Sequence, residues 1–461
     1  MINDKLARKI LNTLIKSGGD FSEIYIQKKI NNNIRLEDGK IDDSSSGFDL
    51  GCGLRLIFGD STFYAYIDSL QKDKLINAAK VLSSTVSSES NKKILNLIPT
   101  SSSYKVNIKK YPHNIFQENK RDILLVVDKT ARDYSKDIIQ VTSNLSDLED
   151  EIFIANSEGI SSSEKIVKVF LTINIVVKKG REVRTGYKSI AKTSGYEAFE
   201  IKKPSKITRE ACKIAIRMLD AESAPVGSIP VVIGPAFGGV IFHEACGHGL
   251  EADAIIKDAS VFKGKLEKKI ANSVVTAIDD STLPYHWGSY KYDGEGHQSK
   301  KTVLIKDGML KNYIFDLKTS KKLKKLQTGN GRRQSFRHIP MPRMSNTYID
   351  NCKEEPKSII KSVNKGIYAK EFAGGQVDPA TGDFVFGISE GYLIEKGSIT
   401  FPIKGATLIG NGPEVLMRIE AIGNDLDFAP GFCGKGGQSI SNEVGQPTIL
   451  VSRLTVGGTK I

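Results

Sequence analysis

The chain is poor in cysteine and histidine and has no long apolar run. Of its 461 residues five are cysteines and six are histidines. The cysteines, at positions 52, 212, 246, 352 and 433, are too few and too scattered for a disulfide framework, and they indicate a reducing compartment. No segment approaches the roughly 18 apolar residues that a membrane-spanning helix needs. We therefore expect a cytoplasmic protein that does not enter a membrane.

A signal peptide is not expected either. The opening stretch "MINDKLARKILNTLIKSGGD" has its apolar residues at helical spacing and ends at Gly18-Gly19. A signal peptide would instead need a continuous apolar core and a cleavage site of small residues. This pattern predicts an amphipathic surface helix.

The charge balance is basic, with 66 Lys+Arg against 53 Asp+Glu and a net charge of +13. Such an excess can attract nucleic acid. The basic residues are, however, spread along the chain, and the densest run, residues 318–327, fits the solvated face of a short helix. We expect no nucleic-acid binding. A nucleic-acid-associated regulator is kept as an alternative that salt-dependent DNA affinity would support.

The pattern of elements predicts an α+β protein of two domains, 1–220 and 221–461, rich in antiparallel or mixed sheet. Helices are expected near 117–137 and 207–220, and a frayed helix end and loop over 80–93. Hairpin turns are predicted at Asp38-Gly39, Gly59-Asp60, Asp307-Gly308 and Lys396-Gly397. The segment "AESAPVGSIP" lacks periodicity and marks the boundary, after which a short strand, a glycine-rich turn and a helix follow.

That helix carries "FHEACGHGLEAD", in which His243 and His248 are five residues apart. In a regular α-helix residues five apart point about 140° away from each other, so the two imidazoles could not share a metal ion. A π-type turn, which repeats at about five residues, would bring them together. Gly247 and Gly249 would supply backbone freedom for it. The spacing thus fits a metal site on an irregular helix, and a pair of core histidines remains the alternative.

A catalytic zinc ion needs a third protein ligand and an open fourth position. Glu244, beside the first histidine, could face a metal-bound water. The residues alone leave several third ligands open: Cys246, Glu251, Asp253, His286, His297, His338 and Cys433. Cys433 lies in the glycine-rich stretch "APGFCGKGGQ", where the Lys435 ammonium would favour the thiolate that zinc binds. Its alternative role is that of a small buried residue in a turn.

A second segment, "GRRQSFRHIPMP", concentrates Arg332, Arg333, Arg337 and His338. These side chains could bind the carbonyls or the terminal carboxylate of a peptide, or could be solvated or paired within the protein. The strand-rich surroundings allow an extended peptide to be held by strand addition.

"HEACGHGLEAD" followed by "GFCGKGGQ" resembles the TldD/PmbA family of metalloproteases, formerly described as modulators of DNA gyrase. "GNGRRQSFRHIPMPRMSNTYI" and "YDGEGHQSKKTVLIKDGML" also resemble segments of that family. The resemblance covers nearly the whole chain and points to the catalytically competent, TldD-like subunit. It implies zinc ligation by His243, His248 and Cys433 and general-base catalysis by Glu244, although Cys246 is a second soft ligand within the motif.

The expected function is zinc-dependent hydrolysis of peptide bonds in unfolded or short peptides, by Glu-assisted attack of zinc-bound water. The resemblance also implies a homodimer, or a heterodimer with a TldE/PmbA-like paralogue. The alternative within the same family is a non-catalytic subunit of such a complex, which absence of zinc from the purified protein would favour.

Overall fold

The computed structural model describes residues 1–87, 94, 96–378 and 380–458. Its first part is built around one long, curved sheet in the order β3-β2-β1-β5-β6-β4, with β7 paired to β6. The strands are β1 (Phe21–Glu37), β2 (Lys40–Phe58), β3 (Ser61–Ile67), β4 (Ile98–Pro99), β5 (Ile138–Asn156), β6 (Ile160–Lys179) and β7 (Glu182–Lys192). The helices are α1 (Asp4–Ile15), α2 (Lys72–Ser83), η1 (Pro112–Asn114), α3 (Gln117–Arg132), α4 (Ala198–Ile201), α5 (Pro204–Arg217) and η2 (Met218–Asp220).

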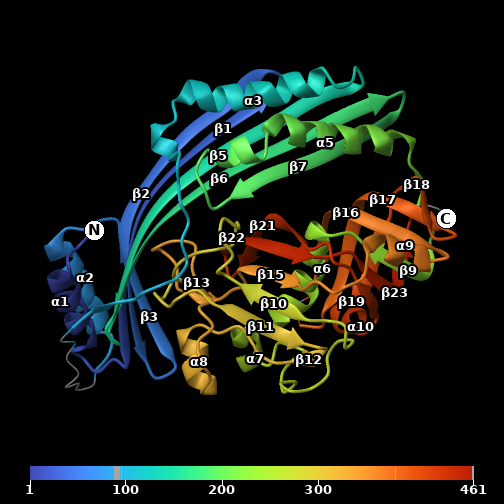
Figure 1. Cartoon of the computed structure of the whole chain (residues 1–461). Helices are drawn as coiled ribbons and strands as arrows, with labels where there is room; N and C mark the ends of the chain where they lie inside the picture. Colours follow the sequence, from blue (N-terminus) through green and yellow to red (C-terminus); the bar gives the residue numbers. More distant parts are fainter. Residues whose placement is uncertain (88–93, 95, 379, 459–461) are drawn as a thin grey trace.

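The sheet forms an arch with helices on its outer face and the C-terminal part on its inner face (Figure 1). Helices α3 and α5 lie over the outer face, and α1 and α2 pack together at one end. The buried residues Ile10, Leu11 and Leu14 of α1 form the stripe that the opening sequence predicts. Among the described residues no helix is both long and apolar enough to cross a membrane.

The C-terminal part contains two larger sheets and one small one. The eight-stranded sheet joins β8 (Glu222–Ser223), β9 (Gly227–Ile233), β16 (Lys365–Val377), β17 (Asp383–Glu395), β18 (Ser398–Lys404), β19 (Thr407–Asn411), β20 (Ile419–Ile422) and β23 (Ile449–Gly457). The six-stranded sheet, in the order β12-β11-β10-β15-β22-β21, joins β10 (Ala277–Asp280), β11 (Lys301–Lys306), β12 (Met309–Leu310), β15 (Asn346–Ile349), β21 (Asp427–Lys435) and β22 (Gln438–Gln446). Strands β13 (Gly331–Arg332) and β14 (Met341–Pro342) form the small sheet.

Short helices connect these sheets: η3 (Ala236–Gly239), α6 (Val240–Phe242), η4 (His243–Gly247), η5 (His248–Leu250), α7 (Ala252–Ile256), α8 (Leu317–Leu323), α9 (Pro356–Ser362) and α10 (Gly412–Met417). A large apolar core lies between the sheets and these helices, separate from the apolar clusters of the first part. The α+β fold class is therefore confirmed. The division at residues 220 and 221 stays a prediction.

The predicted local elements are largely present. The turn Asp38-Gly39 joins β1 to β2, and Lys396-Gly397 joins β17 to β18. In both turns the two residues have positive φ, 49° and 77° in the first and 49° and 73° in the second, which is the hairpin geometry that glycine at the second position favours. The helix expected over 117–137 ends earlier, with α3 at Arg132. Within the predicted loop 80–93, α2 ends at Ser83, and residues 88–93 lie outside the described residues.

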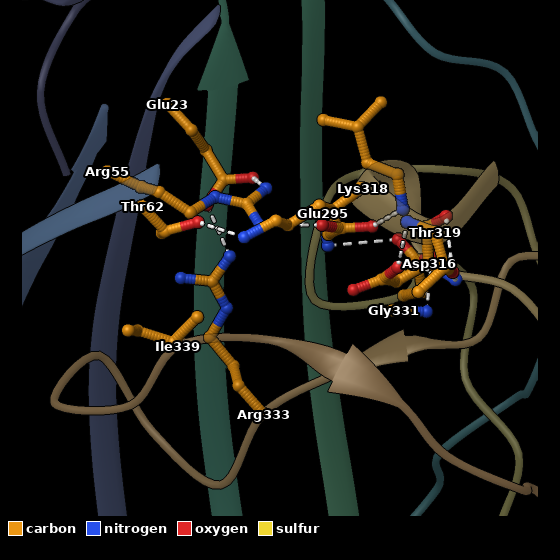
Figure 2. Close-up of polar contacts among 12 residues, drawn as sticks. Glu23, Arg55, Thr62, Glu295, Asp316, Lys318, Thr319, Gly331, Arg333 and Ile339 are labelled. Carbon is orange, nitrogen blue, oxygen red and sulfur yellow. Dashed lines mark hydrogen bonds and ion pairs between the residues drawn. The ribbon is translucent and has the colours of Figure 1, made fainter. Parts of the chain in front are cut away.

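A buried ion cluster joins the two parts of the chain (Figure 2). Arg55 of β2 pairs with Glu23 of β1 at 2.6 Å and with Glu295 of the C-terminal part at 2.8 Å. Arg333 also pairs with Glu23. At most 2% of each of these four side chains is exposed. Glu295 additionally accepts a hydrogen bond from the N–H of Leu317, at the start of α8.

Apolar contact between the parts requires glycine on β2. The Phe336 ring packs so closely that a Cβ on Gly51 would lie 2.2 Å from it. A Cβ on Gly53 would lie 2.5 Å from the carbonyl oxygen of Phe336. The arginine-rich segment therefore docks against the arched sheet, and it fixes the sheet's position relative to the C-terminal part.

Candidate metal centre

The helix that carries His243 and His248 has the irregularity that their spacing demands. Residues His243–Gly247 form a π-helical turn between a short α-helix and a 3₁₀ turn. The extra residue per turn brings the two imidazoles to one side, where their ring centroids are 5.1 Å apart and their planes 84° apart.

Gly247 and Gly249 are needed in this motif for a different reason from the one expected from the sequence. Gly247 has φ −57° and ψ −47°, an ordinary helical conformation. What the turn needs is space: a Cβ on Gly247 would lie 2.3 Å from the sulfur of Met344, and one on Gly249 would lie 2.9 Å from the Phe262 ring. The expectation that they supply backbone freedom is wrong, because close packing rather than an unusual φ accounts for them.

Cys433 reaches the two histidines from the far end of the chain. One nitrogen of His243, one of His248 and the sulfur of Cys433 all lie within 4.8 Å of one another, and the three side chains are buried. The Cys433 sulfur is 3.3 Å from Nε2 of His248. Two imidazoles and a thiol are donors that zinc accepts, and three of them leave a fourth position open. This donor set fits a catalytic zinc ion.

The electrostatics of the cluster favour a thiolate. Burial opposes ionisation of Cys433, but hydrogen bonds and positive charge from His243 and His248 lower the pKa of its thiol to about 4. Lys435, expected from its spacing to have this effect, is not among the groups that lower the pKa of Cys433. It shares a face of β21 with Cys433, but its ammonium pairs with two carboxylates, Glu251 at 2.8 Å and Asp253 at 2.7 Å.

Polar groups surround the two histidines. Nδ1 of His248 lies 2.9 Å from Oε2 of Glu251, which leaves Nε2 directed at the cluster. Although burial alone would raise the pKa of Glu251, His248 and Lys435 lower it to about 2. The amide nitrogen of Asn442 lies beside the His243 ring, 3.2 Å from Nε2 and 3.4 Å from Nδ1. A carboxylate on the nitrogen that faces away from the metal, as Glu251 provides for His248, fixes the ring orientation of a metal-binding histidine.

Arg343 supports the strand that carries the cysteine. Its side chain is completely buried and donates to the backbone carbonyl of Cys433. Neither Arg343 nor Asn442 was expected from the sequence. Asn442 is brought here by the pairing of β22 with β21, and Arg343, which lies between β14 and β15, by the packing of distant segments, so no local signal identifies them.

Glu244 lies on the accessible side of the cluster. Its side chain is 31% exposed, and Oε2 is 3.8 Å from Nε2 of His248. A carboxylate in this position can exchange protons with water and with a ligand at the cluster.

Among the described residues none of the other third-ligand candidates joins this group, although Glu251 contacts His248 from outside it and Asp253 pairs with Lys435. Cys246 is buried in the apolar core, and burial raises the pKa of its thiol. His286 pairs with Glu443 at 2.6 Å, and Nδ1 of His338 contacts the Ser335 hydroxyl at 2.8 Å. His297 is likewise not part of the metal-binding group found among the described residues.

The arginines proposed to bind substrate have partners within the protein. Arg332 donates to the carbonyls of Met344 and Ser441, at 2.5 and 2.7 Å, and is buried. Arg333 belongs to the buried ion cluster of Figure 2. Arg337 pairs with the arched sheet through Asp49 and Asp68. Their binding of substrate stays a prediction. The contacts of Arg333 and Arg337 join the two parts of the chain, whereas those of Arg332 lie within the C-terminal part.

Three family models match successive parts of the chain. They are PmbA/TldA metallopeptidase domain 1 over 22–85, the central domain over 110–219 and the C-terminal domain over 226–458. Three relatives carry related names. The chain is 38% identical to the metalloprotease TldD homolog of Haemophilus influenzae and 37% identical to that of Buchnera aphidicola subsp. Schizaphis graminum, each over 95% of this chain and 93% of the relative. It is 27% identical to the zinc metalloprotease TldD homolog of Saccharolobus solfataricus, over 96% and 97%.

Solved structures share the fold. A candidate modulator of a DNA gyrase from Thermotoga maritima superimposes with a TM-score of 0.80 at 20% identity, over 98% of this chain and 100% of that chain. TldE from Thermococcus kodakarensis gives 0.78 at 20% identity, over 98% and 100%. From its matched domains and its similarity to the two bacterial relatives, the chain belongs to the PmbA/TldD family of metallopeptidases.

Proposed function

We propose that the protein is a zinc-dependent metallopeptidase that hydrolyses short or unfolded peptides. The observation that carries the proposal is the convergence of His243, His248 and Cys433 from two distant segments, beside the half-buried Glu244. The name of the Saccharolobus relative supports zinc as the ion.

The ligands would be the two imidazoles, with that of His248 oriented by Glu251, and the Cys433 thiolate. A zinc ion bound there would supply Lewis-acid activation of water and of the peptide carbonyl. Glu244 takes the proton of the attacking water and returns it to the departing amine. Burial of the two histidines and the cysteine keeps bulk water away from this proton transfer. The substrate would approach from the side of Glu244, which is partly exposed.

An extended substrate can pair with the free edge of β21, the strand of Cys433. In the described residues β21 pairs only with β22. On β22, the N–H groups of Ser439 and Glu443 donate away from β21, to Gln334 and Ser345. Their partners on β21 are Gly434 and Pro430, so Gly434 turns its N–H and carbonyl outward and Pro430, which has no N–H, turns its carbonyl outward. Phe432, two residues from each of them, also turns its N–H and carbonyl outward. Strand addition at this edge binds a peptide through its backbone, which suits substrates of varied sequence.

The alternative proposal within the family is that the protein is a non-catalytic subunit. The similarity of its fold to TldE supports pairing with a related chain. Elemental analysis and peptide cleavage, with and without a chelator, separate the two. We expect about one zinc per chain and chelator-sensitive cleavage of an unfolded polypeptide. Absence of both from the correctly folded protein would contradict the peptidase.

The key variant is Glu244→Gln. We expect it to keep its zinc and to lose at least about 100-fold in cleavage rate, as removal of a general base does. Cys433→Ala is the complementary change, expected to lower the zinc content. Full cleavage by Glu244→Gln, or full zinc content in Cys433→Ala, would refute the assigned role.

A further inference from the structure

An aromatic cluster stands beside Cys433, on the other side of its strand. Phe432 of β21, Phe170 of β6 and Trp287 have ring centroids 5.4 to 5.7 Å apart in each pair. Trp287 is buried, whereas Phe432 is 58% exposed. A large aromatic ring left half in water beside a buried indole offers an apolar surface that a further group can cover.

A cavity of about 450 Å³ is lined by residues of the arched sheet and of the C-terminal part, among them Phe432. Trp287 and Phe432 form part of its wall, and Gln27, Asp150 and Ile152 of the arched sheet form part of its floor. This volume is within the range of sites that hold small ligands. Asp150 is buried and lines the cavity, and its Oδ1 atom has no hydrogen-bond partner among the residues that the structure describes. The cavity therefore contains an unpaired hydrogen-bond acceptor.

The alternation of a β-strand relates this cavity to the metal centre. Cys433 points to the face of the sheet where the two histidines lie, and its neighbour Phe432 points to the opposite face, toward the cavity. A peptide paired with the free edge of β21 alternates in the same way. Every second side chain of such a peptide then lies on the face of the sheet that carries Phe432, and the one opposite Phe432 lies beside its ring.

We propose that the aromatic surface of Phe432 and Trp287, which line the cavity and pack against Phe170, is a specificity subsite that takes a large apolar or aromatic side chain of the substrate. The subsite rests on the proposed peptidase function and adds a preference to it. Backbone pairing at β21 would bind peptides of varied sequence. The subsite would favour those peptides that have a large side chain at the position facing Phe432 and Trp287.

The probes are two fluorescein-labelled decapeptides of alternating glycine and serine, one with a central phenylalanine and the other with a central alanine. Their affinities are measured by fluorescence anisotropy on the Glu244→Gln protein, so that cleavage does not interfere. We expect the phenylalanine peptide to bind about ten-fold more tightly, because one aromatic side chain leaves water. Adding Phe432→Ala should reduce this difference to less than about three-fold.

Phe116→Ala is the matched control, since Phe116 is 76% exposed and lies at the start of α3, on the outer face of the sheet. It should keep the ten-fold difference. Equal binding of the two peptides, or an unchanged difference in Phe432→Ala, would overturn the subsite. Cleavage by the protein without substitutions is measured separately by mass spectrometry. Preferential binding without any cleavage would contradict the proposed function and leave the subsite in place.

Discussion

Replacement of Arg55 by methionine should weaken the junction between the arched sheet and the C-terminal part. The guanidinium bridges Glu23 and Glu295 where neither carboxylate is exposed to water by more than 1%. Glu23 keeps its second partner, Arg333, but Oε1 of Glu295 loses its ion pair. A buried charge left without its partner costs about 3–5 kcal/mol. That is a large part of the roughly 5–15 kcal/mol by which a folded domain is stable.

The single tryptophan gives the assay. Trp287 is 5% exposed and contacts Phe170 of the arched sheet, so its emission should shift to longer wavelength when the two parts separate. Urea unfolding followed at this residue should show a clearly lower midpoint for Arg55→Met. The double variant Arg55→Met/Glu295→Gln removes both charges and should recover most of the loss, because a neutral buried pair avoids the unpaired carboxylate.

The control is the ion pair Lys322–Asp60 at the same junction, 2.9 Å long with side chains 46% and 80% exposed. Lys322→Met should cost less than about 1 kcal/mol. Equal losses for Lys322→Met and Arg55→Met, or no recovery in the double variant, would refute the reasoning that burial makes the inner cluster costly to break.

Two further predictions concern the cavity and the metal shell. Burial and then the charge of Arg332 lower the pKa of Lys168 to about 7, so between pH 7 and 9 the unfolded chain binds a proton that the folded chain does not. The free energy of unfolding should therefore rise by about 2 kcal/mol between pH 7 and 9 because of Lys168 alone. In Lys168→Met this contribution is absent, so the urea midpoint should rise less between the two pH values than it does in the unsubstituted protein. Glu251→Gln removes the carboxylate that orients His248 and should lower zinc affinity about 10- to 100-fold in a chelator competition, and an unchanged affinity would exclude that role.

Local features could be predicted because a few neighbouring residues determine them. The turns at Asp38-Gly39 and Lys396-Gly397 need positive φ at two adjacent positions, which the dipeptides themselves favour. The five-residue spacing of His243 and His248 likewise implies a widened turn, since a regular helix would direct the rings apart. The family resemblance, rather than spacing, singled out Cys433 from the other possible ligands.

The contacts of the arginine-rich segment could not be predicted in the same way. Arg333 and Glu23 are 310 residues apart, and their pairing depends on how the C-terminal part packs against the arched sheet. Guanidinium groups suit a substrate carboxylate and an internal one equally well, so residue type does not distinguish these roles.

The sequence by itself determined the turns, the irregular helix and, through its motifs, the family to which they belong. Tertiary structure decided which thiol approaches the two histidines, since Cys433 and His248 are 185 residues apart and meet only because β21 lies against that helix. It also placed Phe432 beside a cavity lined by both parts of the chain. Turn and helix geometry arise from short-range backbone sterics, whereas a site shared by distant segments exists only once their sheets have packed.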